Sequence, residues 1–135
     1  MVSKIFVNLP VKDLDKSIAF FKALGFSFNP QFTDATAACM VINTDIFAML
    51  LTHGKVKEFT NKQIADAHKT TEVLTALAVD SKESVNEMAE KALKAGGKEA
   101  YPAKDHGFMF VRSFEDLDGH IWELFWMDQQ HVQAQ

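Results

Sequence analysis

The sequence predicts an α+β fold built from two copies of a βαβββ module. Three observations support this prediction: an amphipathic helix pattern that occurs twice, a helix-ending glycine after each pattern (Gly25 and Gly96), and three strand-like segments after each helix. The repeat lies in the pattern rather than in residue identity. A chain of 135 residues is long enough to bury a sizeable apolar core. We therefore expect a single domain over residues 1–135.

The first module is expected over residues 4–53. A strand covers 5–11 and ends near Pro10, because proline cannot donate to a strand ladder. The helix that follows begins after Asp13, whose carboxylate can cap the free N–H groups of its first turn, and it ends at Gly25. Further strands are expected at 26–33, 36–43 and 45–53.

A polar segment at 54–72 interrupts the pattern. We expect it to be a connector or a lid, with one helical turn near 63–68. A short tail is expected at 129–135.

The second module is expected over residues 73–128. Its first strand covers 73–79, and the spacing of Asp80 and Glu83 is typical of a capping box that starts a helix. Asp118-Gly119 predicts a hairpin turn between the last two strands. The three closing strands are expected at 98–104, 107–117 and 121–127.

Composition limits the classes of function. The net charge of −4 argues against nucleic acid as a partner, because phosphate binding favours a basic surface. No apolar run reaches the length of a membrane span, and no signal-peptide pattern occurs at the start. A single cysteine, Cys39, cannot form an internal disulfide. We expect a cytoplasmic protein.

Two motifs resemble a known superfamily. The first is NLPVKDLDKS at 8–17, followed by Phe20-Phe21 and Leu24-Gly25-Phe26, and the second is FEDLDGHIWEL at 114–124. With the double module, they resemble the vicinal oxygen chelate superfamily of glyoxalases, extradiol dioxygenases, fosfomycin-resistance enzymes and bleomycin-resistance proteins. The pattern is most similar to that of the uncharacterised predicted lactoylglutathione-lyase-like group. The resemblance implies a curved mixed sheet around a cavity, and a homodimer.

In enzymes of that superfamily, strands of both modules supply ligands to a divalent metal. The resemblance places the ligand positions of this chain at Phe6, at Leu74 or Thr75, near Ala48, and at Glu123. Only Glu123 can bind a metal, and one carboxylate does not hold a divalent ion tightly. We therefore expect no metal and no other cofactor. The alternative is a non-standard site that uses His53, His106 or His120.

Several side chains are candidates for a site. Glu123 and His106 are the candidates for acid–base chemistry, although Glu123 could instead pair with Arg112 or Lys104 and only support the sheet. Strand alternation groups Phe108, Phe110 and Arg112 on one face, where the guanidinium would suit an anionic ligand unless it forms an ion pair. The expected ligand-binding residues are Phe6, Asn8, Tyr101, Phe108, Phe110, Arg112 and Phe125.

The favoured hypothesis is a metal-free protein that binds a small molecule in an aromatic cavity, as bleomycin-resistance proteins do. Whether the protein is also an enzyme stays open, because a lyase or isomerase could use Glu123 with an unusual metal site or with no metal. A third hypothesis is a dimeric scaffold whose cavity has closed.

Overall fold

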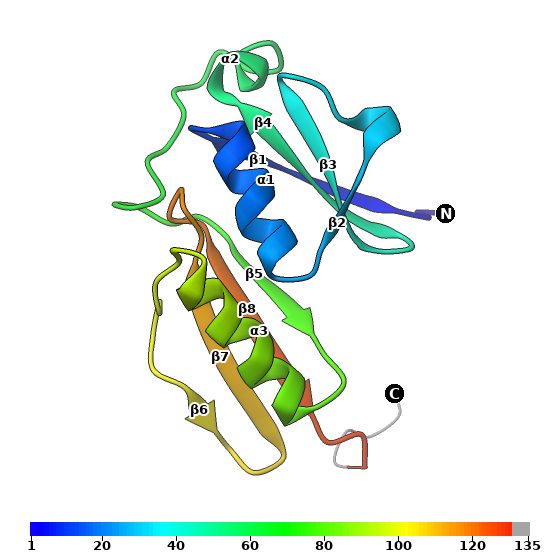
Figure 1. Cartoon of the computed structure of the whole chain (residues 1–135), viewed down its shortest axis with the longest axis vertical. Helices are drawn as coiled ribbons and strands as arrows, with labels where there is room; N and C mark the ends of the chain where they lie inside the picture. The colour runs from blue at the N-terminus through cyan, green and yellow to red at the C-terminus, as the bar shows by residue number, and fades with distance from the viewer. Residues whose placement is uncertain (131–135) are drawn as a thin grey trace. The chain divides into compact units, whose positions relative to one another are not determined.

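A computed structural model describes residues 1–130, so the end of the predicted tail, at 131–135, lies outside the described residues. The chain divides into two compact units, Met1–Asp66 and Ala67–Gln135 (Figure 1). Each unit contains one βαβββ module and one four-stranded mixed sheet. The predicted α+β fold is therefore confirmed. No helix in the described part of the chain is long and apolar enough to cross a membrane.

In the first unit the sheet has the strand order β1-β4-β3-β2, and β1 runs parallel to β4. The side chain of Asp13 accepts a hydrogen bond from the Lys16 amide at 3.1 Å and so caps helix α1, as predicted. The elements are β1 (Ile5–Val11), α1 (Leu14–Ala23), β2 (Ser27–Asn29), a 3₁₀ turn (Pro30–Phe32), β3 (Ala37–Asn43), β4 (Ile46–Thr52) and α2 (His53–Val56).

Helix α1 packs on one face of this sheet. Phe20 and Phe21 of α1 are buried, as are Ala48 and Leu50 of β4. Phe47 and Met49 of β4 are less buried than Ala48 and Leu50, because successive residues of a strand point to opposite faces. The face of the first sheet under α1 is therefore buried, and the other face is partly exposed at Phe47 and Met49 but buried at Leu51.

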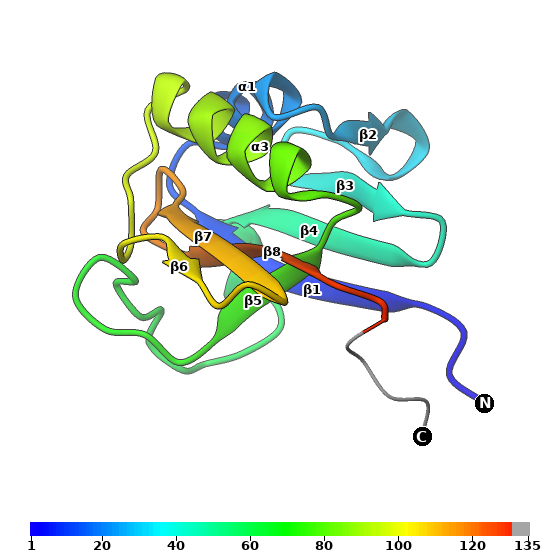
Figure 2. The ribbon, with the colours of Figure 1, turned by 90° about the horizontal axis from the view of Figure 1, so that it is seen from below.

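In the second unit the sheet has the order β5-β8-β7-β6, and β5 runs parallel to β8. Helix α3 covers one face of it (Figure 2). The buried residues Val85, Ala89 and Ala92 of α3 belong to the same core as Trp122 and Leu124 of β8. The elements are β5 (Leu74–Ala78), α3 (Lys82–Lys94), β6 (Lys104–Asp105), β7 (Met109–Glu115) and β8 (Ile121–Met127).

Four local predictions were wrong. The strand expected at 26–33 is reduced to β2, which ends at Asn29 before the 3₁₀ turn. The cap of α3 is Ser81, which accepts a hydrogen bond from the Ser84 amide, rather than Asp80. The strand expected at 98–104 is reduced to β6 and one bridge between Lys98 and Glu115. The helical turn expected at 63–68 is absent, and the short helix α2 lies before it instead.

A tight turn joins β7 to β8, as the Asp118-Gly119 pair predicted. The buried carboxylate of Asp116 accepts hydrogen bonds from the amides of Asp118 and His120 and from Nε1 of Trp122. Gly119 has a φ of +86°, and a Cβ atom built on it would lie 2.7 Å from the backbone nitrogen of His68. Only glycine fits this position without strain.

We predict that Gly119→Ala destabilises the protein by about 2 kcal/mol or more, because it combines a left-handed backbone with a backbone clash. Thermal unfolding measures the effect. The matched control is Gly54→Ala in α2, where a Cβ meets nothing within 4 Å and the melting temperature should stay level or rise slightly. Equal melting temperatures for the two variants would contradict this account of the turn.

Candidate ligand site on the second sheet

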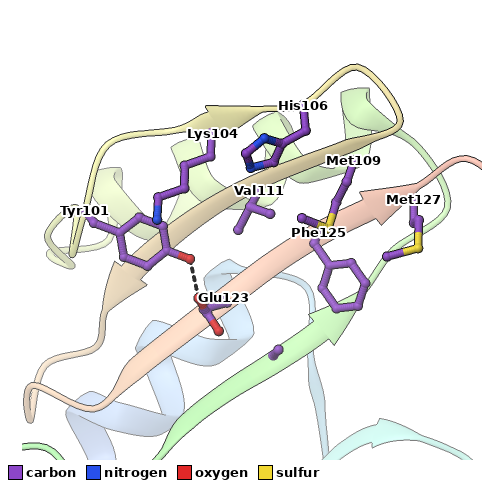
Figure 3. Close-up of a pocket in the computed structure, with 9 residues that line it drawn as sticks. Tyr101, Lys104, His106, Met109, Val111, Glu123, Phe125 and Met127 are labelled. Carbon is purple, nitrogen blue, oxygen red and sulfur yellow. Dashed lines mark hydrogen bonds between the residues drawn. The ribbon is translucent and has the colours of Figure 1, made fainter.

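A pocket of about 400 Å³ lies on the open face of the second sheet, opposite α3. Figure 3 shows Tyr101, Lys104 and Glu123 toward one end and Met109 and Met127 at the other, with His106 between Lys104 and Met109. Strands β5, β7 and β8 and the segment from 101 to 106 contribute the wall. The lining residues are Ala76, Tyr101, Lys104, His106, Met109, Val111, Glu123, Phe125 and Met127.

Strand register arranges these side chains in three rows that cross the sheet, since residues directly opposite each other share a face. The first, which we call the acidic row, is Ser113, Glu123 and Ala76. The middle row is Lys104, Val111, Phe125 and Ala78. The third, which we call the thioether row, is His106, Met109 and Met127, where the His106 amide donates to the Met109 carbonyl at 2.8 Å.

Tyr101 fixes the carboxylate of the acidic row. Its hydroxyl donates a hydrogen bond to Oε2 of Glu123 (Figure 3). The backbone of Tyr101 is held in turn by the buried Ser113: the Tyr101 amide donates to the Ser113 hydroxyl at 3.0 Å, and that hydroxyl donates to the Tyr101 carbonyl at 3.2 Å. Glu123 and Tyr101 therefore form an oriented pair at one end of the pocket.

The environment keeps the Tyr101 phenol protonated. Burial raises the pKa of Tyr101 above its ordinary value near 10, and the hydrogen bond to Glu123 and the negative charge of Glu123 raise it further. The phenol is thus a hydrogen-bond donor, not an anion, at neutral pH. Lys104 adds a cation over the same ring, with Nζ 4.8 Å from the ring centroid.

The donor set of the pocket does not fit a divalent metal. Glu123 is flanked in its row by Ala76 and by Ser113, which is hydrogen-bonded to the Tyr101 backbone, and its own carboxylate is bound to the Tyr101 hydroxyl. Within residues 1–130, no three His, Cys, Asp or Glu side chains group closely enough to hold a metal ion. Because a divalent ion needs several such ligands, the pocket offers too few of them to hold one.

The three histidines considered for a non-standard metal site lie on different elements. His53 begins α2 in the first unit. His120 precedes β8, whereas His106 lies beside the far end of β8, next to the row of Met109 and Met127.

Two expected ligand-binding residues lie on the wrong face of the sheet for this pocket. Arg112 faces α3, where its guanidinium donates to Oδ1 of Asn86 at 3.1 Å and to Oε2 of Glu90 at 3.2 Å. Phe110 shares that face, because it lies two residues from Arg112. Arg112 and Lys104 were the expected partners of Glu123, but the hydroxyl of Tyr101 is the group that binds its carboxylate.

The remaining predicted ligand-binding residues lie partly in the second unit and partly in the first. Phe125 lines the pocket in the middle row. Phe108 lies in the loop before β7, is 37% exposed and is outside the pocket lining. Phe6 and Asn8 belong to the first unit, where Phe6 is 48% exposed and stacks on Phe47 at a ring distance of 4.6 Å.

The first-unit counterpart of Glu123 also differs from the expected Ala48. Asn8 and Ala76 each lie three residues before a valine, Val11 at the end of β1 and Val79 directly after β5. In register, Asn8 is opposite Met49 as Ala76 is opposite Glu123. Ala48 itself is fully buried in the core beneath α1. The equivalent position is therefore Met49, which carries no metal-binding carboxylate.

Sequence reasoning missed the apolar wall of the pocket, formed by Met109, Val111 and Met127. The predicted hairpin turn contained the information needed to identify this wall. Counting outward from the Asp118-Gly119 turn places Val111, rather than Arg112, on the same face as Glu123.

We predict that the single tyrosine of the chain ionises well above pH 10 in the folded protein, and that Glu123→Gln lowers its pKa while burial keeps it elevated. Ultraviolet phenolate absorbance measures this directly. The sign for stability follows: the unfolded chain ionises first, so the free energy of unfolding falls as the pH rises above 10. An unshifted midpoint in the wild type, or no change in Glu123→Gln, would show that the pair does not form.

Comparisons with known proteins support the fold. Residues 4–43 match the family model described as bleomycin resistance protein-like N-terminal. No curated protein matches the sequence. A hypothetical protein from S. aureus is 28% identical, with a TM-score of 0.78 over 93% of this chain and 94% of that chain.

Two further structures share the fold at lower identity. A glyoxalase-related enzyme from Fulvimarina pelagi is 20% identical, with a TM-score of 0.78 over 93% of this chain and 88% of that chain. The fosfomycin resistance protein FosX from Listeria monocytogenes is 20% identical, with a TM-score of 0.69 over 96% of this chain and 98% of that chain. The resemblance seen in the sequence motifs is confirmed: the chain has the fold of the glyoxalase, bleomycin-resistance and dioxygenase superfamily, and its first strands and helix match the bleomycin-resistance-like family.

Proposed function

We propose that this protein binds a small amphipathic molecule on the open face of its second sheet, without a divalent metal. The observation that carries the proposal is the pairing of Glu123 with the Tyr101 hydroxyl at one end of an otherwise largely apolar pocket. The pocket volume, about 400 Å³, lies within the range of small-molecule sites. The match of residues 4–43 to a bleomycin-resistance-like family supports the same class of function.

The polar end favours a ligand that donates hydrogen bonds. A carboxylate has about four lone-pair positions, and Tyr101 uses one of those on Glu123. The remaining positions accept from an amine or a hydroxyl of the ligand. Since Tyr101 is fixed through Ser113, the carboxylate is already oriented and loses little freedom when the ligand binds.

The apolar end favours an aromatic or branched aliphatic body. Phe125 offers a ring in the middle of the pocket, with Val111 opposite it in register. The methionine side chains beside them adapt to irregular ligand shapes, because the thioether chain is flexible and polarisable. Burial of the ligand body against these groups supplies the affinity, and Glu123 supplies the orientation.

The homodimer and the cytoplasmic location that the sequence predicted remain predictions. Light scattering of the purified protein would measure the first.

Thermal shift with matched probes tests the proposal. We expect aromatic amines and alcohols to raise the melting temperature, because a ligand that binds only the folded state stabilises it. Carboxylates of the same size should have less effect. Glu123→Gln should weaken amine binding by about 10-fold or more, the loss expected when a charged acceptor becomes neutral. The control Glu87→Gln removes a carboxylate from the exposed side of α3 and should leave binding unchanged.

Two results would contradict the proposal. One is the absence of a shift with every probe class, which would favour a scaffold with no open site. The other is turnover of a hemithioacetal that is lost in Glu123→Gln, which would assign Glu123 to a lyase or isomerase reaction.

A further inference from the structure

The thioether row has a chemistry that the proposed ligand site does not require. Met109 and Met127 occupy the end of the pocket away from Tyr101, and His106 lies between Lys104 and Met109 (Figure 3). Leucine or isoleucine would also supply an apolar wall, although a less adaptable one. An imidazole beside two thioethers is instead a set of soft and borderline metal ligands.

Backbone pairing holds the three side chains side by side. Met109 and Met127 are directly opposite in the β7–β8 register, which puts their Cβ atoms about 5 Å apart. His106 continues the same row, because its amide donates to the Met109 carbonyl at 2.8 Å. Met109 is thus the central member, with one ligand group on each side.

Hydrogen bonds hold the loop that carries His106 in place. Oδ1 of Asp105 accepts from the Gly107 amide at 2.8 Å, and the Asp128 amide donates to the Phe108 carbonyl at 2.7 Å. Gly107 has a φ of +79°, which lets the chain reverse direction between β6 and β7. The backbone of His106 is therefore held beside Met109, while its exposed imidazole lies 6.3 Å from the Phe108 ring and can turn toward the methionines.

We propose that the thioether row binds one soft monovalent cation, Cu(I) or its redox-stable analogue Ag(I), through Nδ1 or Nε2 of His106 and the Sδ atoms of Met109 and Met127. This site goes beyond the proposed ligand-binding function and does not depend on it. Thioethers select Cu(I) over hard ions, and two thioethers with one imidazole give the low coordination number that such ions accept.

The row also lacks what a hard divalent ion needs. Its members carry no carboxylate, and Glu123 lies four residues along β8 from Met127, about 13 Å by strand rise. The middle row, which separates them, contains Val111, Phe125 and Lys104 and supplies no carboxylate. The geometry therefore separates a soft-cation end from the Glu123 end of the same pocket.

Silver titration followed by methionine methyl NMR tests this inference. The chain has six methionines, so ¹³C labelling of their methyl groups gives six probes. The titration is done in Cys39→Ala, because a cysteine thiol also binds soft cations. One equivalent of Ag(I) should shift the Met109 and Met127 signals and leave the Met40 and Met88 signals in place.

Substitutions assign the ligands. Met109→Leu and Met127→Leu preserve volume and should each weaken Ag(I) binding by about 10-fold or more, as should His106→Gln. Met88→Leu in α3 is the matched control and should bind as the parent does. Circular dichroism of each variant shows that it is folded.

Several outcomes would overturn the inference: no one-to-one binding, shifts spread over all six methyl groups, or binding that persists in the Met109→Leu, Met127→Leu double variant. None of these outcomes affects the proposed function, which the organic probes test separately. Conversely, Ag(I) binding in a protein that ignores every organic probe would remove only the proposed function.

Discussion

The turn at Asp116 sets the register on which the second unit depends. The buried carboxylate of Asp116 accepts hydrogen bonds from two backbone amides and from the indole N–H of Trp122. Burial raises the pKa of Asp116 and so opposes the charge of its carboxylate. These bonds place Glu123 opposite Ser113. A slip of one residue would bring Trp122 to the open face and Glu123 into the core, so this register is strongly specified.

This register decides which side chains of β7 and β8 line the pocket. The face under α3 takes Trp122 and Leu124, and the other face takes Glu123 and Phe125. Ser113, carried to the open face by the same pairing, fixes the Tyr101 backbone, and Tyr101 then binds Glu123. The Tyr101 phenol thus binds the one carboxylate that the superfamily resemblance assigns to a metal, and this pairing is the basis of the proposed metal-free ligand site.

Much of the fold could be predicted from local signals. Asp13, Gly25 and the Asp118-Gly119 pair act through nearby backbone, and their positions were predicted correctly. The faces of β7 could not be predicted from alternation alone, because both faces carry large apolar residues. Arg112 was therefore assigned to the ligand although it binds α3.

Glu123, Tyr101, His106 and Phe125 were all named from the sequence, and they line one pocket. Their partnership could not be predicted, because Tyr101 and Glu123 are separated by 22 residues and meet only through tertiary packing. The thioether row could not be predicted for the same reason. Met109 and Met127 are distant in sequence, and only the pairing of β7 with β8 brings them side by side.

The metal content of protein purified without chelator tests the central claim most directly, namely that Tyr101 rather than a divalent metal holds Glu123. Elemental analysis should find Ni, Zn, Fe and Mn far below one equivalent, and none of these ions should raise the melting temperature. Near-stoichiometric metal that is lost in Glu123→Gln would contradict the account and restore a metal centre to this fold.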